Sequence, residues 1–314
     1  NLAMKKYLYT ILCISQISFL YSQTVQKIRI NPDQAYGGPV SDYFENIEYI
    51  PLETTKESLF GDVSEMVVTH DSYVIFDWDT KSVLFFKKED GKFLTKKTFN
   101  KNASINISYV NHSNSIIVNV GQSNRLKSNI YSFSSLGIPI KSFKLADNNL
   151  SNGSKLLSID EGYFLITGNS HVMTDQRLSS DTIYLLNVYK NNNFHKGLFP
   201  VTQSGNTAIC MLHGYLNTGN ITPQGSMYVA MPLTHVVYKI TKDTAEATFQ
   251  LIFPSSRIID PIIIQGNDIK KISALREKLF SDPKTILTVS NIFYHKKDLF
   301  FKINTRIYTS YAGS

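Results

Sequence analysis

The sequence predicts an all-β protein, a β-propeller built from four-stranded antiparallel blades, and three observations lead to this prediction. Short apolar runs recur along the chain, as is typical of strands. Turn signals separate them, and an Asp-Gly pair between apolar runs, as at Asp90-Gly91, is a strong hairpin signal. The runs group into units of roughly 40 to 50 residues, the period of propeller blades.

The first blade is predicted within the stretch from Asp62 to Phe99. Its four strands are Met66–Thr69, Tyr73–Asp77, Val83–Phe86 and Phe93–Phe99, and its turns are His70-Asp71-Ser72, Trp78–Ser82 and Glu89–Lys92. At Asp90-Gly91 we expect a tight turn with positive φ at both residues. This stretch is therefore interpreted as a four-stranded meander.

The same pattern predicts further blades. The second runs over Ile105–Leu145, the third over Lys155–Phe199 and the fourth over Ala208–Phe253, and a fifth begins with Ile286–Tyr294, Leu299–Asn304 and part of a strand near Ile307–Tyr311. About four and a half blades are thus expected in the chain. A ring of this size would leave a sheet edge unpaired, so we expect the chain to be truncated at its C-terminus and to lack roughly one and a half blades.

Two strands are predicted ahead of the meanders, at Val25–Ile30 and Phe44–Leu52. The second alternates apolar and polar residues up to Pro51, which suits an edge strand. Strands in this position are expected to complete the last unit of the ring.

One helix is predicted between Asp260 and Pro283, where the strand pattern stops. Asp268 can cap the helix and Pro283 ends it. Its apolar residues fall on one face, namely Ile269, Ile272, Leu275 and Leu279. We expect this inserted helix to pack on the flank of the propeller rather than to bind a membrane or a partner.

The N-terminus predicts export. Lys5-Lys6, the apolar run Tyr7–Leu20 and the small residue Ser22 form the pattern of a signal peptide over residues 1–22, which leaves a propeller domain at 23–314. An uncleaved anchor is the alternative, although the run is short for a membrane span. Lipid attachment at Cys13 is also open, although Ile11-Leu12 are not small. The predicted location is the periplasm, the cell envelope or the exterior, without a transmembrane segment after cleavage.

Composition excludes some classes of protein. After removal of Cys13 the single remaining thiol is Cys210, so no internal disulfide is expected. The formal net charge is +7, but the basic residues are scattered along the sequence. A nucleic-acid-binding protein would carry a clustered basic stripe, so no nucleic-acid partner is expected. The oligomeric state is left open.

The stretch Ile47-Glu48-Tyr49-Ile50-Pro51-Leu52-Glu53-Thr54, followed by Val83-Leu84-Phe85-Phe86 and Asp90-Gly91-Lys92-Phe93, resembles the six-bladed β-propeller family of exported Bacteroidetes proteins. The resemblance covers most of the chain from about Val25. Asn100–Ser104 stands where members of that family often carry a turn similar to Gly-Arg-Gly-Pro. Since the family is largely uncharacterised, the resemblance implies architecture and an envelope location, with ligand binding suspected, and no particular reaction.

No motif for a cofactor, a metal or a nucleophile is found in the sequence. It contains no Gly-rich phosphate loop, His-Glu-x-x-His, Cys-x-x-Cys or nucleophile elbow. Asp77-Trp78-Asp79 has the opening spacing of a calcium loop, but Ser82 and Lys88 replace the required Gly and Glu. The seven His residues are dispersed. We expect no cofactor and no metal, and we favour a protein that is not an enzyme.

Candidate ligand-binding residues come from loops that should open on one face. In a propeller the loops between second and third strands lie on the same face as the loops between blades, and here they span Trp78–Ser82, Gly121–Asn129, Gly168–Ser180 and Pro232–Thr234. The charged and aromatic residues in or next to them are Trp78, Arg125, Lys127, His171, Asp175, Arg177 and His235. An aromatic plate beside charged donors suits a sugar ring or a carboxylate.

The leading hypothesis is a secreted or envelope-associated propeller that binds a small molecule, a glycan or a peptide on that face without catalysis. The alternative is a propeller lyase or hydrolase with a channel site built from His and Arg of several blades. A partner-binding scaffold, which would expose a broad apolar patch, and a truncated product that folds poorly are also considered.

Overall fold

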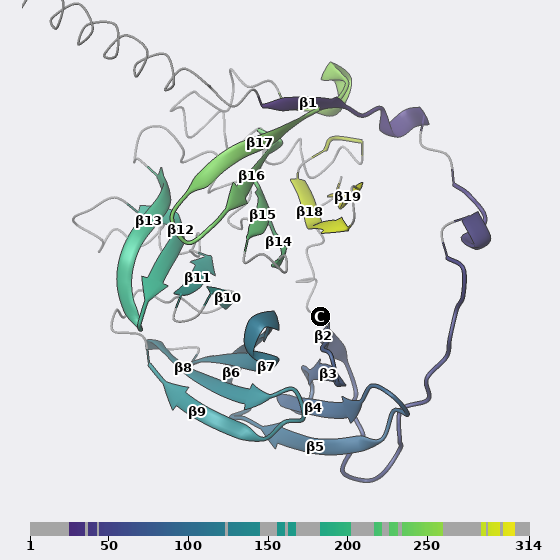
Figure 1. Cartoon of the computed structure of the whole chain (residues 1–314), viewed down its shortest axis with the longest axis vertical. Helices are drawn as coiled ribbons and strands as arrows, with labels where there is room; N and C mark the ends of the chain where they lie inside the picture. Colours follow the sequence, from purple (N-terminus) through teal and green to yellow (C-terminus); the bar gives the residue numbers. More distant parts are fainter. Residues whose placement is uncertain are drawn as a thin grey trace, which may run out of the picture.

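The structure is a computed structural model that describes residues 25–34, 37–42, 44–122, 125–144, 156–160, 163–167, 183–201, 217–221, 226–231, 234–259, 284–286, 288–295 and 298–304. These residues form five sheets arranged around a common centre (Figure 1). The first strands of successive sheets lie next to each other, β2 by β6, β6 by β10, β10 by β14 and β14 by β18. The predicted all-β propeller is confirmed.

The first blade follows the predicted meander closely. Its strands are β2 (Val63–Val68), β3 (Ser72–Asp77), β4 (Ser82–Lys87) and β5 (Phe93–Thr98), hydrogen-bonded in that order. The central residues of β3 and β4 are apolar because both faces of these strands are buried, one against the next blade and one against the segment that precedes the blade. β5 carries Lys96 and Lys97 and is less buried, as suits an outermost strand.

The later blades repeat this order. Blade two contains β6 (Ala103–Val110), β7 (Ser115–Gln122), β8 (Arg125–Ser134) and β9 (Pro139–Phe143), and blade three contains β10 (Leu156–Asp160), β11 (Tyr163–Thr167), β12 (Ile183–Lys190) and β13 (Asn193–Val201). Blade four contains β14 (Asn217–Ile221), β15 (Met227–Ala230), β16 (Val236–Ile240) and β17 (Ala245–Ile252). β18 (Thr288–His295) and β19 (Asp298–Asn304) form a two-stranded sheet after it.

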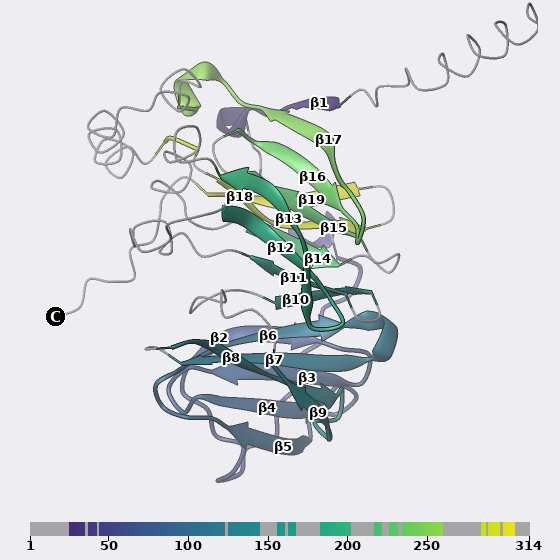
Figure 2. The same cartoon turned by 90° about the vertical axis from the view of Figure 1, so that its left-hand side faces the viewer.

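Each pair of neighbouring blades shares an apolar cluster. Val74, Phe76, Val83 and Phe85 of blade one meet the inner strands of blade two, and Figure 2 shows these two blades packed together. Leu186 and Val188 of blade three pack against Met227, Val229 and Ile240 of blade four. The fold is therefore held by contacts between blades, and removal of apolar volume from one blade loosens the next one.

The predicted strand at Phe44–Leu52 is wrong. Residues 44–50 have no strand structure, and Phe44, Ile47 and Tyr49 expose 62%, 60% and 89% of their surface. Alternation alone does not make a strand, because a strand also needs a neighbour with which to pair. The described residues between β1 and blade one instead form an extended connection, with the short 3-10 turns η1 (Pro32–Gln34) and η2 (Val40–Asp42) (Figure 1).

The other N-terminal strand exists but pairs elsewhere than expected. β1 (Gln26–Arg29) adds to the outer edge of blade four, parallel to β17, and does not complete the last sheet. Asp33 and Arg257 form an ion pair after this strand, and Arg257 also donates a hydrogen bond to the carbonyl oxygen of Lys284. The N-terminal connection is thus tied to the end of blade four.

Several expectations fall outside the described residues. These are the signal peptide at 1–22, the inserted helix between Asp260 and Pro283, and the strand near Ile307–Tyr311. In the part of the chain that the structure describes, the helical segments are short 3-10 turns of three residues each.

The Asp90-Gly91 turn differs from the predicted type. Of its two residues only Gly91 has a positive φ, of 71°, and the Gly91 N–H donates to the carbonyl oxygen of Lys87. This geometry is a longer turn ending in a left-handed glycine. The connection from residues 44–62 crosses the hairpin here, because the Glu53 N–H donates to the carbonyl oxygen of Gly91 at 2.9 Å.

We expect Gly91→Ala to destabilise the protein. A β-carbon at Gly91 would lie 2.1 Å from the carbonyl oxygen of Pro51, and the left-handed conformation costs a non-glycine residue about 1–2 kcal/mol. The melting temperature should fall by several degrees. Gly37→Ala is the matched control, since a β-carbon there meets nothing within 4 Å. Equal melting temperatures for the two variants would contradict the crossing at Gly91.

Candidate functional site

The turns of the blades open on two opposite faces. The crossover face carries the connections between second and third strands and those between blades, among the described residues 78–81, 99–102 and 234–235. The hairpin face carries the other turns, among them residues 69–71, 88–92, 111–114 and 135–138. The sequence predicts the ligand site on the crossover face.

Trp78 lies on the crossover face, as predicted, and is 49% exposed. The ammonium of Lys81 sits 2.9 Å from the centre of the Trp78 ring, and Phe76 contacts the ring at 6.2 Å in an edge-on arrangement. Burial lowers the pKa of Lys81, against the raising effect of Asp79. Lys81 therefore already occupies one face of the indole on which a sugar could stack.

Asp77 holds this turn in place. Its carboxylate accepts hydrogen bonds from the Asp62 and Asp79 N–H groups, each at 3.1 Å, and from the Thr80 hydroxyl at 2.6 Å. Burial alone would raise the pKa of Asp77, but these hydrogen bonds outweigh it and lower the pKa. The Asp77-Trp78-Asp79 motif thus forms a turn, as the sequence indicated.

The structure describes some of the remaining predicted site residues and not others. Arg125 and Lys127 lie in strand β8, where the sequence suggested a long loop over Gly121–Asn129, because β7 and β8 continue to pair through their polar ends. His171, Asp175 and Arg177 lie outside the described residues. A ligand site that includes these five residues stays a prediction.

His235 belongs to the same predicted set but is buried, with 4% of its surface exposed. Its ring packs edge-on against Phe253 at 5.0 Å, and neither ring nitrogen has a hydrogen-bond partner among the described residues. Burial lowers the pKa of His235 to about 4. The ring is neutral at pH 7 and does not reach the rim.

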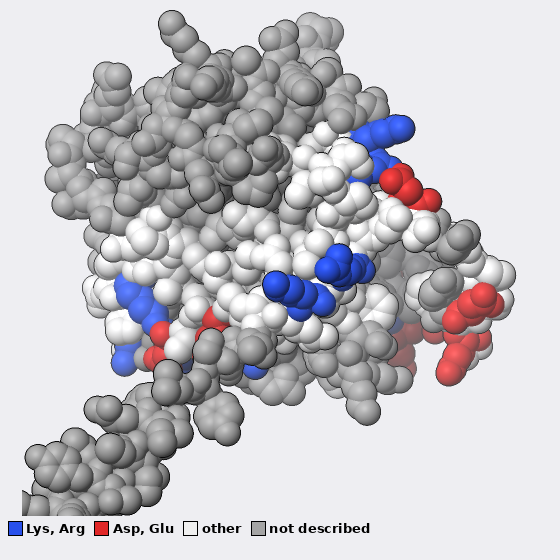
Figure 3. All heavy atoms as spheres, turned by 90° about the horizontal axis from the view of Figure 1, so that it is seen from above, with Lys and Arg blue, Asp and Glu red and all other residues white. Residues whose placement is uncertain are grey.

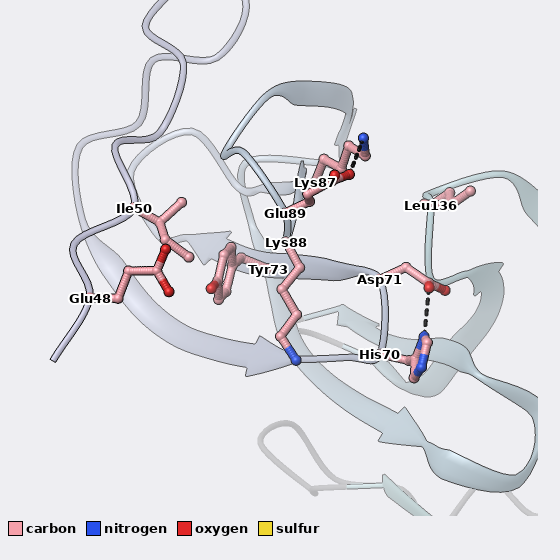
Figure 4. Close-up of a pocket in the computed structure, with 9 residues that line it drawn as sticks. All are labelled: Glu48, Ile50, His70, Asp71, Tyr73, Lys87, Lys88, Glu89 and Leu136. Atoms are coloured by element: carbon pink, nitrogen blue, oxygen red, sulfur yellow. Dashed lines mark hydrogen bonds and ion pairs between the residues drawn. The ribbon is translucent and has the colours of Figure 1, made fainter. Parts of the chain in front are cut away.

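The hairpin face contains an open pocket of about 720 Å³ beside the turns of blades one and two (Figure 4). Its lining residues are Glu48, Ile50, His70, Asp71, Tyr73, Lys87, Lys88, Glu89 and Leu136. They come from the N-terminal connection, from two turns of blade one and the adjoining ends of β3 and β4, and from one turn of blade two. The volume lies in the range of small-molecule sites.

Asp71 organises the wall of this pocket. Its carboxylate accepts from the Asn114 amide at 2.6 Å and from the Ser135 hydroxyl at 2.7 Å, both in blade two, and lies 2.7 Å from His70 Nδ1. The hydrogen bond from His70, followed by those from Ser135 and Asn114, lowers the pKa of Asp71 to about 2. Asp71 is therefore ionised at neutral pH and joins two blades.

The backbone beneath Asp71 is equally well defined. Thr69 Oγ1 accepts from the Asp71 and Ser72 N–H groups at 3.1 and 2.8 Å, which forms a local turn. The N–H of Lys88 donates to the carbonyl oxygen of Asp71 at 2.8 Å, so the two turns of blade one support each other. The pocket wall is thus set before any ligand arrives.

Some of the charged residues that line the pocket form ion pairs with each other, and others do not. Lys87 and Glu89 form an ion pair at 2.6 Å, in which Glu89 raises the pKa of Lys87. Glu48 and Lys88 form no ion pair with another described residue, and both are exposed. In Figure 4 Tyr73 lies between them. The pocket therefore offers one carboxylate and one ammonium on either side of an aromatic ring.

Sequence reasoning missed this pocket because each of its residues looks like an ordinary turn residue. His70-Asp71 was assigned as a turn, and Asn114 and Ser135 lie more than forty residues further along the chain. The signal that could have found it is the recurrence of short polar side chains in turns that a propeller brings to one face.

The described residues contain no group of metal ligands, and those that Figure 3 shows form no basic stripe that would mark another candidate site. Among the described residues no group of His, Cys, Asp and Glu could hold a metal ion. The described basic side chains that Figure 3 shows lie in separate groups rather than in one continuous stripe. In the described part of the chain no helix is long and apolar enough to cross a membrane.

Comparisons with known proteins give the same architecture. A family model described as a 6-bladed beta-propeller matches residues 22–303. The crystal structure of a Bacteroides fragilis protein described as exported is similar to this chain, with 14% sequence identity and a TM-score of 0.56, and covers 90% of this chain and 75% of that one. At this identity the likeness shows the fold alone.

A weaker likeness exists to a Bacteroides caccae protein of unknown function, with 10% identity and a TM-score of 0.40 over 74% of this chain and 66% of that one. No curated protein matches the chain.

Proposed function

Because the chain belongs to the six-bladed β-propeller family, whose model matches residues 22–303, we propose that it is an exported binding protein that takes a small polar ligand in the pocket of blades one and two. The predicted signal peptide and the likeness to an exported Bacteroides fragilis protein support export. The carrying observation for binding is the Asp71 network, which holds the pocket wall through hydrogen bonds from His70, Asn114 and Ser135.

Preorganisation is the physical reason for this choice. A ligand gains affinity when the wall of its pocket is already fixed, since less conformational freedom is then lost on binding. The pocket combines this fixed wall with apolar contacts from Ile50 and Leu136 and an aromatic ring from Tyr73. Trp78, by comparison, already has one ring face covered by Lys81.

The proposal is tested by thermal melts with a panel of amino acids, short peptides, sugars and organic acids. A ligand at 100 times its dissociation constant should stabilise the protein by about 2.7 kcal/mol. Leu136→Trp, which fills the pocket from its rim, should abolish the shift. Ile138→Trp is the matched control, because Ile138 lies on the same turn, is 62% exposed and does not line the pocket.

Two outcomes would overturn this function. One is a panel in which no compound changes the melting temperature. The other is a ligand whose shift survives in Leu136→Trp, which would place its site elsewhere, for example on the crossover face that the sequence favoured.

One observation favours catalysis as a second candidate. Asp71 lies 2.7 Å from His70 Nδ1, an arrangement that orients an imidazole and directs its Nε2 as a general base. The side chain of His70 is 83% exposed, however, and catalytic groups gain most where water is excluded. If the protein is an enzyme, His70→Gln should abolish turnover, while the hydrogen bonds from Asn114 and Ser135 keep the Asp71 wall in place and binding persists. Turnover that survives this change would remove the candidate.

A further inference from the structure

From the charges left over in the pocket we propose that the ligand is zwitterionic, a free amino acid or a short peptide with both termini unblocked. This inference rests on the proposed binding function and specifies its ligand. The ammonium group of the ligand would meet the Glu48 carboxylate, and its carboxylate would meet the Lys88 ammonium.

The protein already neutralises several of the ionised groups that line the pocket. Lys87 and Glu89 satisfy each other at 2.6 Å. The Asp71 carboxylate receives its hydrogen bonds from His70, Asn114 and Ser135. These groups shape the pocket but have little capacity left for a ligand, since a carboxylate that already accepts several hydrogen bonds gains less from another.

Glu48 and Lys88 are the charged lining residues that form no ion pair with another described residue. The Lys88 ammonium is 3.5 Å from the carbonyl oxygen of Thr69, the limit of a hydrogen bond, so it can turn toward a ligand. Glu48 comes from the N-terminal connection and Lys88 from the β4–β5 turn, on either side of Tyr73 (Figure 4). A ligand with one charge of each sign matches this pair, and complementary charges give specificity.

A neutral sugar matches the pocket less well. A sugar has no charge to meet Glu48 or Lys88, and the Tyr73 ring on which it could stack is partly buried against the apolar cluster of Ile75, Leu84 and Phe86. A ligand with a single negative charge would leave Glu48 unpaired and would face repulsion from it. A ligand with a single positive charge would meet the same difficulty at Lys88.

Four probes separate these cases by isothermal titration. Glycylglycine carries both charges, N-acetylglycylglycine lacks the ammonium, glycylglycinamide lacks the carboxylate, and cellobiose is neutral. We expect glycylglycine to bind at least about tenfold more tightly than each of the other three, since a hydrogen bond to a charged group is worth roughly this factor.

Two variants assign each charge to its residue. In Glu48→Gln, glycylglycine and its N-acetyl form should bind equally, whereas in Lys88→Met, glycylglycine and its amide should bind equally. Lys92→Met is the matched control, because Lys92 lies on the same turn as Lys88, pairs with Asp90 at 3.5 Å and does not line the pocket. It should preserve the whole order of affinities.

The inference fails if glycylglycine has no advantage over the blocked peptides, if cellobiose binds more tightly, or if none of the four probes binds. It also fails if the preference persists unchanged in both variants. These results leave the binding function to be judged on its own by the Leu136→Trp melts, which use a wider panel.

Discussion

Between pH 7 and pH 4 the protein is expected to lose about 3 kcal/mol of unfolding free energy through His235 alone. In the folded protein, burial lowers the pKa of His235 to about 4, whereas the unfolded chain should titrate near 6.5. Below pH 6.5 the unfolded state therefore binds the proton first. The loss grows as the pH falls from there toward the folded-state pKa, and it levels off below pH 4.

Urea unfolding at pH 7, 5.5 and 4.5 measures this loss. His235→Asn removes the titrating group and keeps a residue that tolerates the positive φ of 55° at this position. The variant should show a smaller decline between pH 7 and pH 4.5 than the wild-type protein. His112→Asn, at an exposed turn position, should retain the wild-type decline. An identical decline in His235→Asn and the wild type would mean that the ring is not buried as described.

Phe85→Ala is expected to cost about 3–5 kcal/mol of unfolding free energy, because Phe85 is fully buried between blades one and two. Its ring packs against Phe133 of β8 at 6.0 Å. The melting temperature should fall by on the order of 10 °C. Phe44→Ala, at a residue that is 62% exposed, should change stability by no more than about 0.5 kcal/mol.

The effect of Phe85→Ala should extend to the pocket. β4 leads into Lys87 and Lys88, and β8 leads into Ser135 and Leu136. A loosened joint between these strands would move the donors that Asp71 needs, so ligand affinity should fall with stability. A variant that melts early but binds its ligand as tightly as the wild-type protein would show that the joint does not position the site.

The blades could be predicted from the sequence because their signals are local. In blade one, apolar runs such as Val83–Phe86 and turns such as Glu89–Lys92 are next to each other in the chain, and the predicted order β2 to β5 is confirmed. The strand predicted at Phe44–Leu52 is wrong because alternation of apolar and polar residues does not show whether a partner strand lies beside it. The loop predicted over Gly121–Asn129 is wrong for the opposite reason. There β7 and β8 stay paired as far as Gln122 and Arg125, although the residues are polar.

The pocket could not be predicted in the same way because its parts come together only in the folded ring. Asp71, Asn114 and Ser135 are ordinary turn residues in sequence, and their hydrogen bonds depend on how blade two sits against blade one. Trp78 was conspicuous in sequence, but Lys81 covers one face of its ring in the structure. A rare residue in a turn can therefore stabilise the turn itself and need not bind a ligand.

The most direct test of the account is a crystal structure of the chain grown with the compound that raises its melting temperature most. We predict electron density for this compound beside Tyr73, within hydrogen-bond distance of Glu48 and Lys88, with the Asp71 network unchanged. Density on the crossover face beside Trp78, with the pocket of blades one and two unoccupied, would contradict the account.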